Sequence, residues 1–144
     1  MIIRPFEETD LPAAAELEAR CFPDPWSRKG LRDTFREKYA CFLAAECDGI
    51  LCGYVNAAWV LDELNLNRIC VHPDFRRQGV AAGLLEALKE FCRGRKITRI
   101  FLEVRASNLP AQALYRSAGF AELGKRPRFY QNPEEDAILM GIKL

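Results

Sequence analysis

Residues 71–83 combine residue types that could bind a phosphate group. An apolar run ends in a basic segment with Arg76, Arg77 and Gly79, and a helical pattern follows. Amides at a helix N-terminus lack internal acceptors and lie at the positive end of the helix dipole, so they bind anions. Gly79 and the small Ala81 would let a ligand approach the backbone, and the arginines add charged donors. An ordinary solvated turn with two surface arginines has the same composition, and neither G-x-x-x-x-G-K-[ST] nor G-x-G-x-x-G occurs in the chain.

Residues 100–105 place a carboxylate inside an apolar strand. Alternation puts Glu103 and Arg105 on one face of the strand and the aliphatic side chains on the other. Glu103 then either pairs with a cation, for which Arg105 is the obvious candidate, or lies in a cleft and accepts a proton. Both interpretations stay open at this point.

A phenol and an amide follow this strand. Tyr115 belongs to a helical pattern in which Ala111, Leu114 and Ala118 are expected to face inward. It is therefore either a core aromatic or a group that could give a proton to a departing thiolate. Asn108 is placed to cap the same helix, a role that needs no ligand.

The elements that must position these residues follow from periodicity and turn chemistry. Helices are predicted over 11–18, after Ser27, over 80–91 with Gly94 as the stop, and over 110–118. Strands are predicted over 1–4, 41–45, 51–61, 64–71, 97–104, 120–126 and 137–142, and Asp48-Gly49 predicts a hairpin. We therefore expect one mixed α/β domain over residues 1–144.

Composition argues against several classes of protein. With 21 Lys+Arg against 20 Asp+Glu, the net charge of +1 provides no global field toward nucleic acid or an anionic membrane. The six cysteines include no C-x-x-C pair and are expected to be reduced core thiols of a cytoplasmic protein. One histidine without clustered ligands gives no support for a metal. We expect no signal peptide, because Glu7 and Glu8 come before any long apolar stretch, and no membrane helix, because no apolar run approaches ~20 residues.

Three segments, 69–81 (ICVHPDFRRQGVA), 102–108 (LEVRASN) and 113–120 (ALYRSAGF), together resemble the GNAT acetyltransferases. Within that family they are most similar to enzymes that acetylate the N-terminal alanine of a ribosomal protein. The resemblance covers the full chain. It implies an α/β (α+β) GNAT fold with a mixed, mostly antiparallel sheet of six to seven strands and about four helices. It also implies acetyl-CoA as cosubstrate, no metal, and a monomer or weak dimer.

The resemblance assigns roles by position. Glu103 falls on the general base and Tyr115 on the general acid. The implied cofactor contacts are Ile69, Cys70, Val71, Arg76, Arg77, Gln78, Gly79, Val80, Ala81, Asn108 and Tyr115. The acceptor is expected near Trp26 and Tyr130. Glu63 is a further candidate from its charge alone, because an acidic residue there could attract a cationic N-terminus. At 129–130 two consecutive tyrosines are usual, so Phe129 departs from the family pattern and makes the acceptor contacts there less certain.

Proton chemistry favours an α-amine as the acceptor. An α-amine with a pKa of ~8 is about one tenth neutral at pH 7, whereas a lysine at ~10.4 is neutral in roughly one molecule per few thousand. The expected substrate is the N-terminal amine of a protein, in line with the ribosomal-protein resemblance. Lysine or a small-molecule amine is the alternative acceptor, and a non-catalytic acyl-CoA-binding module is the alternative function.

Overall fold

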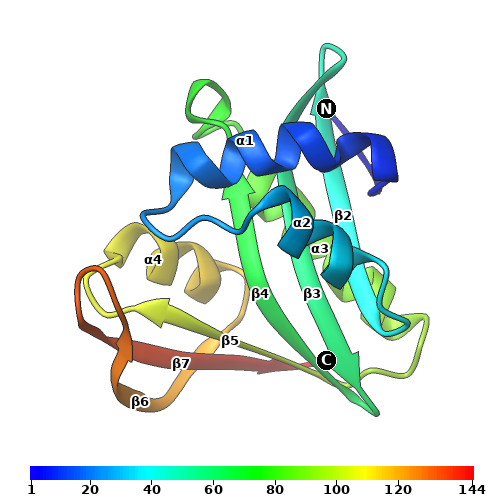
Figure 1. Ribbon diagram of the computed structural model, residues 1–144. Coiled ribbons are helices and arrows are strands. Elements are labelled where there is room, and N and C mark those ends of the chain that lie inside the picture. Colours follow the sequence, from blue (N-terminus) through cyan, green and yellow to red (C-terminus); the bar gives the residue numbers. More distant parts are fainter.

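The computed structural model describes residues 1–144, which form one seven-stranded sheet and four α-helices (Figure 1). The strands are β1 (Ile2–Pro5), β2 (Ala40–Cys47), β3 (Ile50–Val60), β4 (Glu63–Val71), β5 (Arg99–Arg105), β6 (Ala121–Tyr130) and β7 (Glu135–Lys143). The helices are α1 (Leu11–Cys21), α2 (Arg28–Phe35), α3 (Val80–Arg93) and α4 (Leu109–Ser117), with 3-10 turns η1 (Glu8–Asp10) and η2 (Pro73–Phe75). Across the sheet the order is β1-β2-β3-β4-β5-β7-β6. Only β4 and β5 pair in parallel, which confirms the mixed, mostly antiparallel sheet.

Local turn and cap chemistry explains several of these boundaries. Asp48 and Gly49 have φ values of 51° and 75°, the left-handed pair that a tight hairpin between β2 and β3 requires. The Ser27 hydroxyl accepts from the Gly30 amide at 3.0 Å and starts α2. The Asn108 side chain accepts from the Ala111 amide at 3.2 Å and starts α4. Both predicted caps are confirmed.

Several predicted strand ends differ from the structure by one to four residues, and two of them have a local cause. Residues 97–98 belong to the connection between α3 and β5 rather than to β5, because the Ile97 amide donates back to the Cys92 carbonyl. β6 continues past Pro127 to Tyr130 across an irregular segment in which Arg128 has a φ of 54° and its amide donates to Asp136. The prediction ended β6 too early because a proline interrupts strand pairing, and here the irregularity accommodates it.

Helices cover both faces of the sheet and define two apolar clusters. α1 and α2 lie on one face, whereas α3 and α4 lie on the other (Figure 1). The α3/α4 cluster includes Leu84, Leu88, Leu102 and Tyr115. The α1/α2 cluster is smaller and centres on Leu17, Leu31, Phe42 and Tyr54. Along β4 and β5, successive side chains therefore alternate between the α1/α2 layer and the α3/α4 layer.

An irregularity in β4 decides where the sheet opens. Asn56 pairs with Arg68 and Ala57 pairs with Leu66, so Asn67 is an extra residue on β4. Parallel pairing with β5 ends at the same place, with Leu66 opposite Leu102. Beyond it β4 and β5 diverge (Figure 1). A bulge both ends pairing and shifts the faces of the residues that follow, so Arg68 and Cys70 face α1.

Candidate active site

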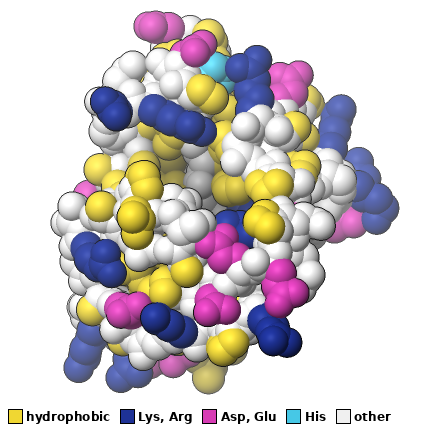
Figure 2. Space-filling model, turned by 90° about the vertical axis from the view of Figure 1, so that its left-hand side faces the viewer, with side chains coloured by type: hydrophobic (Ala, Val, Ile, Leu, Met, Phe, Trp, Pro, Cys, Tyr) yellow, Lys and Arg dark blue, Asp and Glu magenta, His cyan; other side chains and the backbone are white.

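A cavity of about 860 Å³ lies between the diverging parts of β4 and β5. Its size is within the range of small-molecule sites. Figure 2 shows the hollow in the surface, with hydrophobic side chains around it. Its lining comes from the end of α1, from β4, from the turn before α3, from β5 and from α4. The cavity thus joins the two helix layers through the gap in the sheet.

The turn between β4 and α3 offers backbone amides to the cavity. Arg77 and Gly79 have φ values of 62° and 80°, and α3 begins at Val80. The first helical hydrogen bond at this end runs from the Gly83 amide to the Gly79 carbonyl at 2.9 Å. Amides in the first turn of a helix have no intrahelical acceptor. A Cβ atom on Gly79 would meet nothing within 4 Å, so there is free space beside this backbone.

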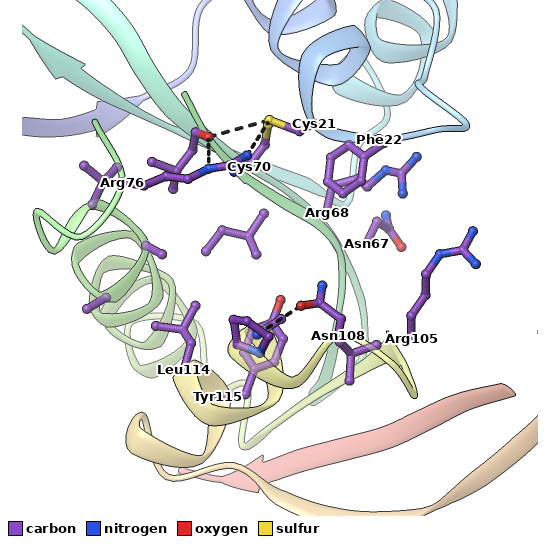
Figure 3. A pocket seen from close by; sticks show the side chains of 18 of the residues that line it. Cys21, Phe22, Asn67, Arg68, Cys70, Arg76, Arg105, Asn108, Leu114 and Tyr115 are labelled. Atoms are coloured by element: carbon purple, nitrogen blue, oxygen red, sulfur yellow. Dashed lines mark hydrogen bonds between the residues drawn. The ribbon is translucent and has the colours of Figure 1, made fainter. Parts of the chain in front are cut away.

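Side chains of this turn point in different directions. Arg76 folds back so that its Nε donates to the Val71 carbonyl at 3.4 Å and its Nη2 lies 3.7 Å from the Cys21 sulfur (Figure 3). Arg77 lines the cavity, with Gly79, Val80 and Ala81. Gln78 does not line it, because its side-chain amide donates to the Asp74 carbonyl at 3.3 Å.

The free edge of β4 forms one wall. The His72 amide donates to Cys52 of β3, whereas the Val71 carbonyl accepts from Cys21 and Arg76 on the cavity side. Strand alternation puts the backbone polar groups of Ile69 on that side as well. The Cys70 thiol instead donates to the Leu17 carbonyl of α1 at 3.5 Å. Among residues 69–71, the backbone groups of Ile69 and the amide of Val71 are therefore free to meet a ligand, whereas the Val71 carbonyl already has partners.

Glu103 lines the opposite wall, on β5, and its ion-pair partner differs from the predicted one. The carboxylate is 25% exposed and lies 3.3 Å from Arg126 of β6. Arg105 points elsewhere: it donates to the Gln131 carbonyl at 2.9 Å and pairs with Glu135 at 3.3 Å. Alternation along one strand could not reveal Arg126, because β7 lies between β5 and β6.

Tyr115 reaches the cavity from α4, in the α3/α4 layer. Its side chain is almost fully buried and lines the cavity, and burial raises its pKa above the ordinary value, so the phenol stays protonated. The predicted inward stripe of α4, Ala111, Leu114 and Ala118, packs against the α3/α4 cluster but is only half-buried, while Gln112 and Tyr115 are buried.

Gln112 was missed in the sequence analysis. Its side-chain amide donates to the carbonyls of Arg105 and Ala106 at 3.1 and 3.0 Å. These bonds fix α4 against the end of β5, and so fix Tyr115 relative to Glu103. The only signal in the sequence was a glutamine close to the end of a predicted strand.

The remaining predicted site residues lie at different places. Asn108 lines the cavity while capping α4, and Tyr130 lines the mouth beside Glu103. Burial, and then the charge of Glu103, raise the pKa of Tyr130 to about 12. Trp26 packs against the α1/α2 cluster and does not line the cavity. Glu63 is exposed at the other end of β4, where it lies opposite Arg99 in the register with β5. The structure therefore does not bring Glu63 to the cavity.

The mouth on the α1 side contains residues that the sequence analysis did not single out. Phe22 and Asp24, from the segment between α1 and α2, line it together with Asn67 and Arg68 of β4. Figure 3 shows Arg68 and Phe22 facing each other across this part of the cavity. Nothing in the local sequence around Arg68 indicates this contact, because it joins residues 46 positions apart.

No group of three or more His, Cys, Asp or Glu side chains is placed to hold a metal ion. None of the helices has the length and apolar character needed to cross a membrane.

Comparisons with known proteins agree with this geometry. The model of the acetyltransferase (GNAT) family matches residues 11–120. The [ribosomal protein bS18]-alanine N-acetyltransferase of Escherichia coli K12 is 40% identical over 144 residues, covering 99% of this chain and 97% of that protein. A putative enzyme of the same name from Bacillus subtilis 168 is 32% identical, covering 99% and 95%.

The solved structures give the same result. The crystal structure of the Escherichia coli ribosomal-protein-S18-alanine N-acetyltransferase is similar with a TM-score of 0.91 and 38% identity, covering 99% of this chain and 92% of that one. Its fold extends over all the elements that surround the cavity. The chain therefore belongs to the GNAT family of acetyltransferases.

Proposed function

We propose that this enzyme transfers an acetyl group from acetyl-CoA to the N-terminal α-amine of a protein, namely the N-terminal alanine of a small-subunit ribosomal protein. It acts as a single domain over residues 1–144, in the cytoplasm, as a monomer or weak dimer. The observation that carries the proposal is that Glu103 of β5 and Tyr115 of α4 line the same cavity. The names of the relatives from Escherichia coli and Bacillus subtilis support the choice of acceptor.

Acetyl-CoA would enter from the α3/α4 layer. The pyrophosphate would bind the amides of residues 77–82 with Arg77 as a charged donor, because this turn combines left-handed residues with a helix N-terminus. The pantetheine arm would then follow the free edge of β4 at Ile69 and Val71. Asn108 lines the same cavity and would contact CoA while it caps α4. We call residues 69–82 and α4 the donor side.

The acceptor would enter from the α1/α2 layer, past Tyr130 and the segment between α1 and α2. Glu103, directly or through one water, takes a proton from the ammonium and leaves a neutral amine. The amine attacks the thioester carbonyl, and the Val71 amide stabilises the resulting oxyanion. Tyr115 then gives its proton to the CoA sulfur as the carbon–sulfur bond breaks, and the tyrosinate regains a proton when the acetylated nitrogen loses its excess one to become the amide. We call residues 22–26, Arg68 and Tyr130 the acceptor side.

The test is direct identification of the amine that gains the acetyl group. The purified protein is incubated with acetyl-CoA and small-subunit ribosomal proteins, and each N-terminus is analysed by mass spectrometry. We expect an acetyl mass on an N-terminal alanine. Parallel reactions with an Ala-starting peptide, its lysine-containing but N-terminally blocked counterpart, and free polyamines compare the acceptor classes. Faster acetylation of lysine or polyamine than of the α-amine would contradict the proposal.

A further inference from the structure

The segment between α1 and α2, residues 22–26, forms part of the acceptor-side wall but has no regular secondary structure. Its backbone is connected to the rest of the molecule mainly through α1. The Phe22 amide donates to the Glu18 carbonyl at 3.0 Å, and the Trp26 amide donates to the Glu18 carboxylate at 2.9 Å. These two hydrogen bonds connect the segment to α1 and do not fix its distance from β4. Other contacts must fix that distance.

Arg68 supplies those contacts from β4. Its Nη2 donates to the Asp24 carbonyl at 2.6 Å and lies 3.4 Å from the Asp24 carboxylate. Its guanidinium carbon lies 3.9 Å from the centre of the Phe22 ring, a cation–π contact. Arg68 faces this segment because the bulge at Asn67 sets its direction. One side chain thus holds two residues of the wall.

Glu18 of α1 contacts the Arg68 guanidinium. The carboxylate is fully buried, with Oε1 at 3.3 Å from Arg68 Nε and Oε2 accepting from the Tyr54 hydroxyl. Arg68 Nε is buried and makes no hydrogen bond, so charge rather than a directed bond joins the two groups. A buried ion pair of this kind is weak evidence for stability, because desolvation offsets the attraction. Its geometry is more informative than its energy.

We propose that the Glu18–Arg68 pair positions the acceptor: it fixes residues 22–26 against β4, opposite Tyr130, so that the incoming chain meets a preformed wall. This inference rests on the proposed function for the identity of the acceptor. Preformed contacts reduce the ordering cost of binding, so the pair should affect acceptor binding more than chemistry. Neither residue contacts the donor turn at 76–82, so binding of acetyl-CoA should not depend on the pair.

The test is the double variant Glu18→Gln, Arg68→Met, which removes both charges and keeps similar side-chain volumes. We expect KM for an Ala-starting peptide to rise about tenfold, with kcat nearly unchanged and the Kd of acetyl-CoA the same. Amide hydrogen exchange of residues 22–27 should become faster. The matched control is Glu8→Gln, Arg36→Met, which removes an exposed pair of 2.7 Å at the far end of α2 and should change none of these quantities.

A milder variant covers the case in which the double variant does not fold. Arg68→Lys keeps the charge but loses the planar group that stacks on Phe22 and bonds Asp24. It should show a smaller rise in acceptor KM at constant Kd for acetyl-CoA. An unchanged acceptor KM with unchanged exchange in these variants would overturn the inference. So would equal losses of acceptor and acetyl-CoA binding, because a general loosening predicts them.

The proposed function and the positioning role can fail separately. If the wild-type protein acetylates no α-amine, the proposed function is wrong, and the peptide kinetics then say nothing of the pair. The exchange of residues 22–27 still decides whether Glu18 and Arg68 fix this wall. Protection that is equal in the wild type and the double variant would reject that role.

Discussion

The donor and acceptor sides of the cavity are built in different ways. The donor side uses mainly the backbone of the continuous segment 69–82, in which Arg77 and Gly79 adopt left-handed conformations just before α3. The acceptor side uses side chains from distant parts of the chain, including Glu18, Arg68 and Tyr130. A backbone site is set by local conformation, whereas a side-chain site depends on packing between elements. The two sides should therefore respond to substitution in separable ways.

The largest expected effect lies where the two sides meet. Glu103→Gln preserves the shape of the side chain but removes its ability to accept a proton, so kcat should fall by about 10²–10⁴. The Kd of acetyl-CoA should stay the same, since Glu103 is not part of the donor turn. Stopped-flow or steady-state thiol release and calorimetry measure the two quantities.

The control for this variant is Glu122→Gln, an exposed carboxylate on β6. It should leave both turnover and binding unchanged. Wild-type turnover in Glu103→Gln would remove Glu103 from the mechanism, and a parallel loss of acetyl-CoA binding would mean that the two sides are not separable.

The same contrast explains what the sequence could predict. The donor turn was accessible because Arg76, Gly79 and the start of α3 are adjacent in the chain, and turn chemistry is local. Strands and caps such as Ser27 and Asn108 followed from the same local rules. The parallel β4–β5 pair, and with it the gap in the sheet, depends on a bulge at Asn67 that no local pattern indicated.

The ion pairs of the site were not predictable in the same way. Glu103 was expected beside Arg105 because the two share a strand face, but Arg126 occupies that role from a strand two positions away in the sheet. Arg105 instead pairs with Glu135, 30 residues later. Such choices are made by tertiary packing, which brings several candidate cations within reach of one carboxylate.

Tyr115→Phe should have the next largest effect, a fall in kcat of about 10², because the leaving thiolate loses its proton donor. Burial keeps the wild-type phenol protonated over the whole working pH range, so the loss should not depend on pH. Tyr39→Phe, which changes an exposed tyrosine elsewhere, is the control. Rate profiles across pH measure both, and a Tyr115→Phe variant with wild-type kcat would exclude the phenol as the acid.

Gly79→Val tests the donor side with a smaller effect. A β-branched residue is strained at a φ of 80°, at a cost of about 1–3 kcal/mol, so the turn should shift and the Kd of acetyl-CoA should rise roughly tenfold. KM for the acceptor, measured at saturating acetyl-CoA, should stay the same. Gly49→Val is a matched control, because Gly49 has a φ of 75° and equally open space but lies in the β2–β3 hairpin. It should lower the Tm similarly and leave the Kd unchanged; equal Kd values in the two variants would argue against a backbone site at Gly79.

The smallest effect concerns Cys21, which belongs to the acceptor-side helix α1 yet contacts Arg76 of the donor turn. The neighbouring Cys70 thiol, and then the Arg76 guanidinium, hold the pKa of the Cys21 thiol below its ordinary value. Its thiolate therefore forms at lower pH, and alkylation by iodoacetamide should level off below about pH 8.5, the ordinary thiol pKa. Cys92, whose pKa burial raises to about 11, should stay unlabelled.

Arg76→Gln should move the plateau to higher pH, and acetyl-CoA should slow labelling because Cys21 lines the cavity. A labelling rate that keeps rising well above that pH, or that ignores acetyl-CoA, would show that Cys21 does not lie at the boundary between the two sides.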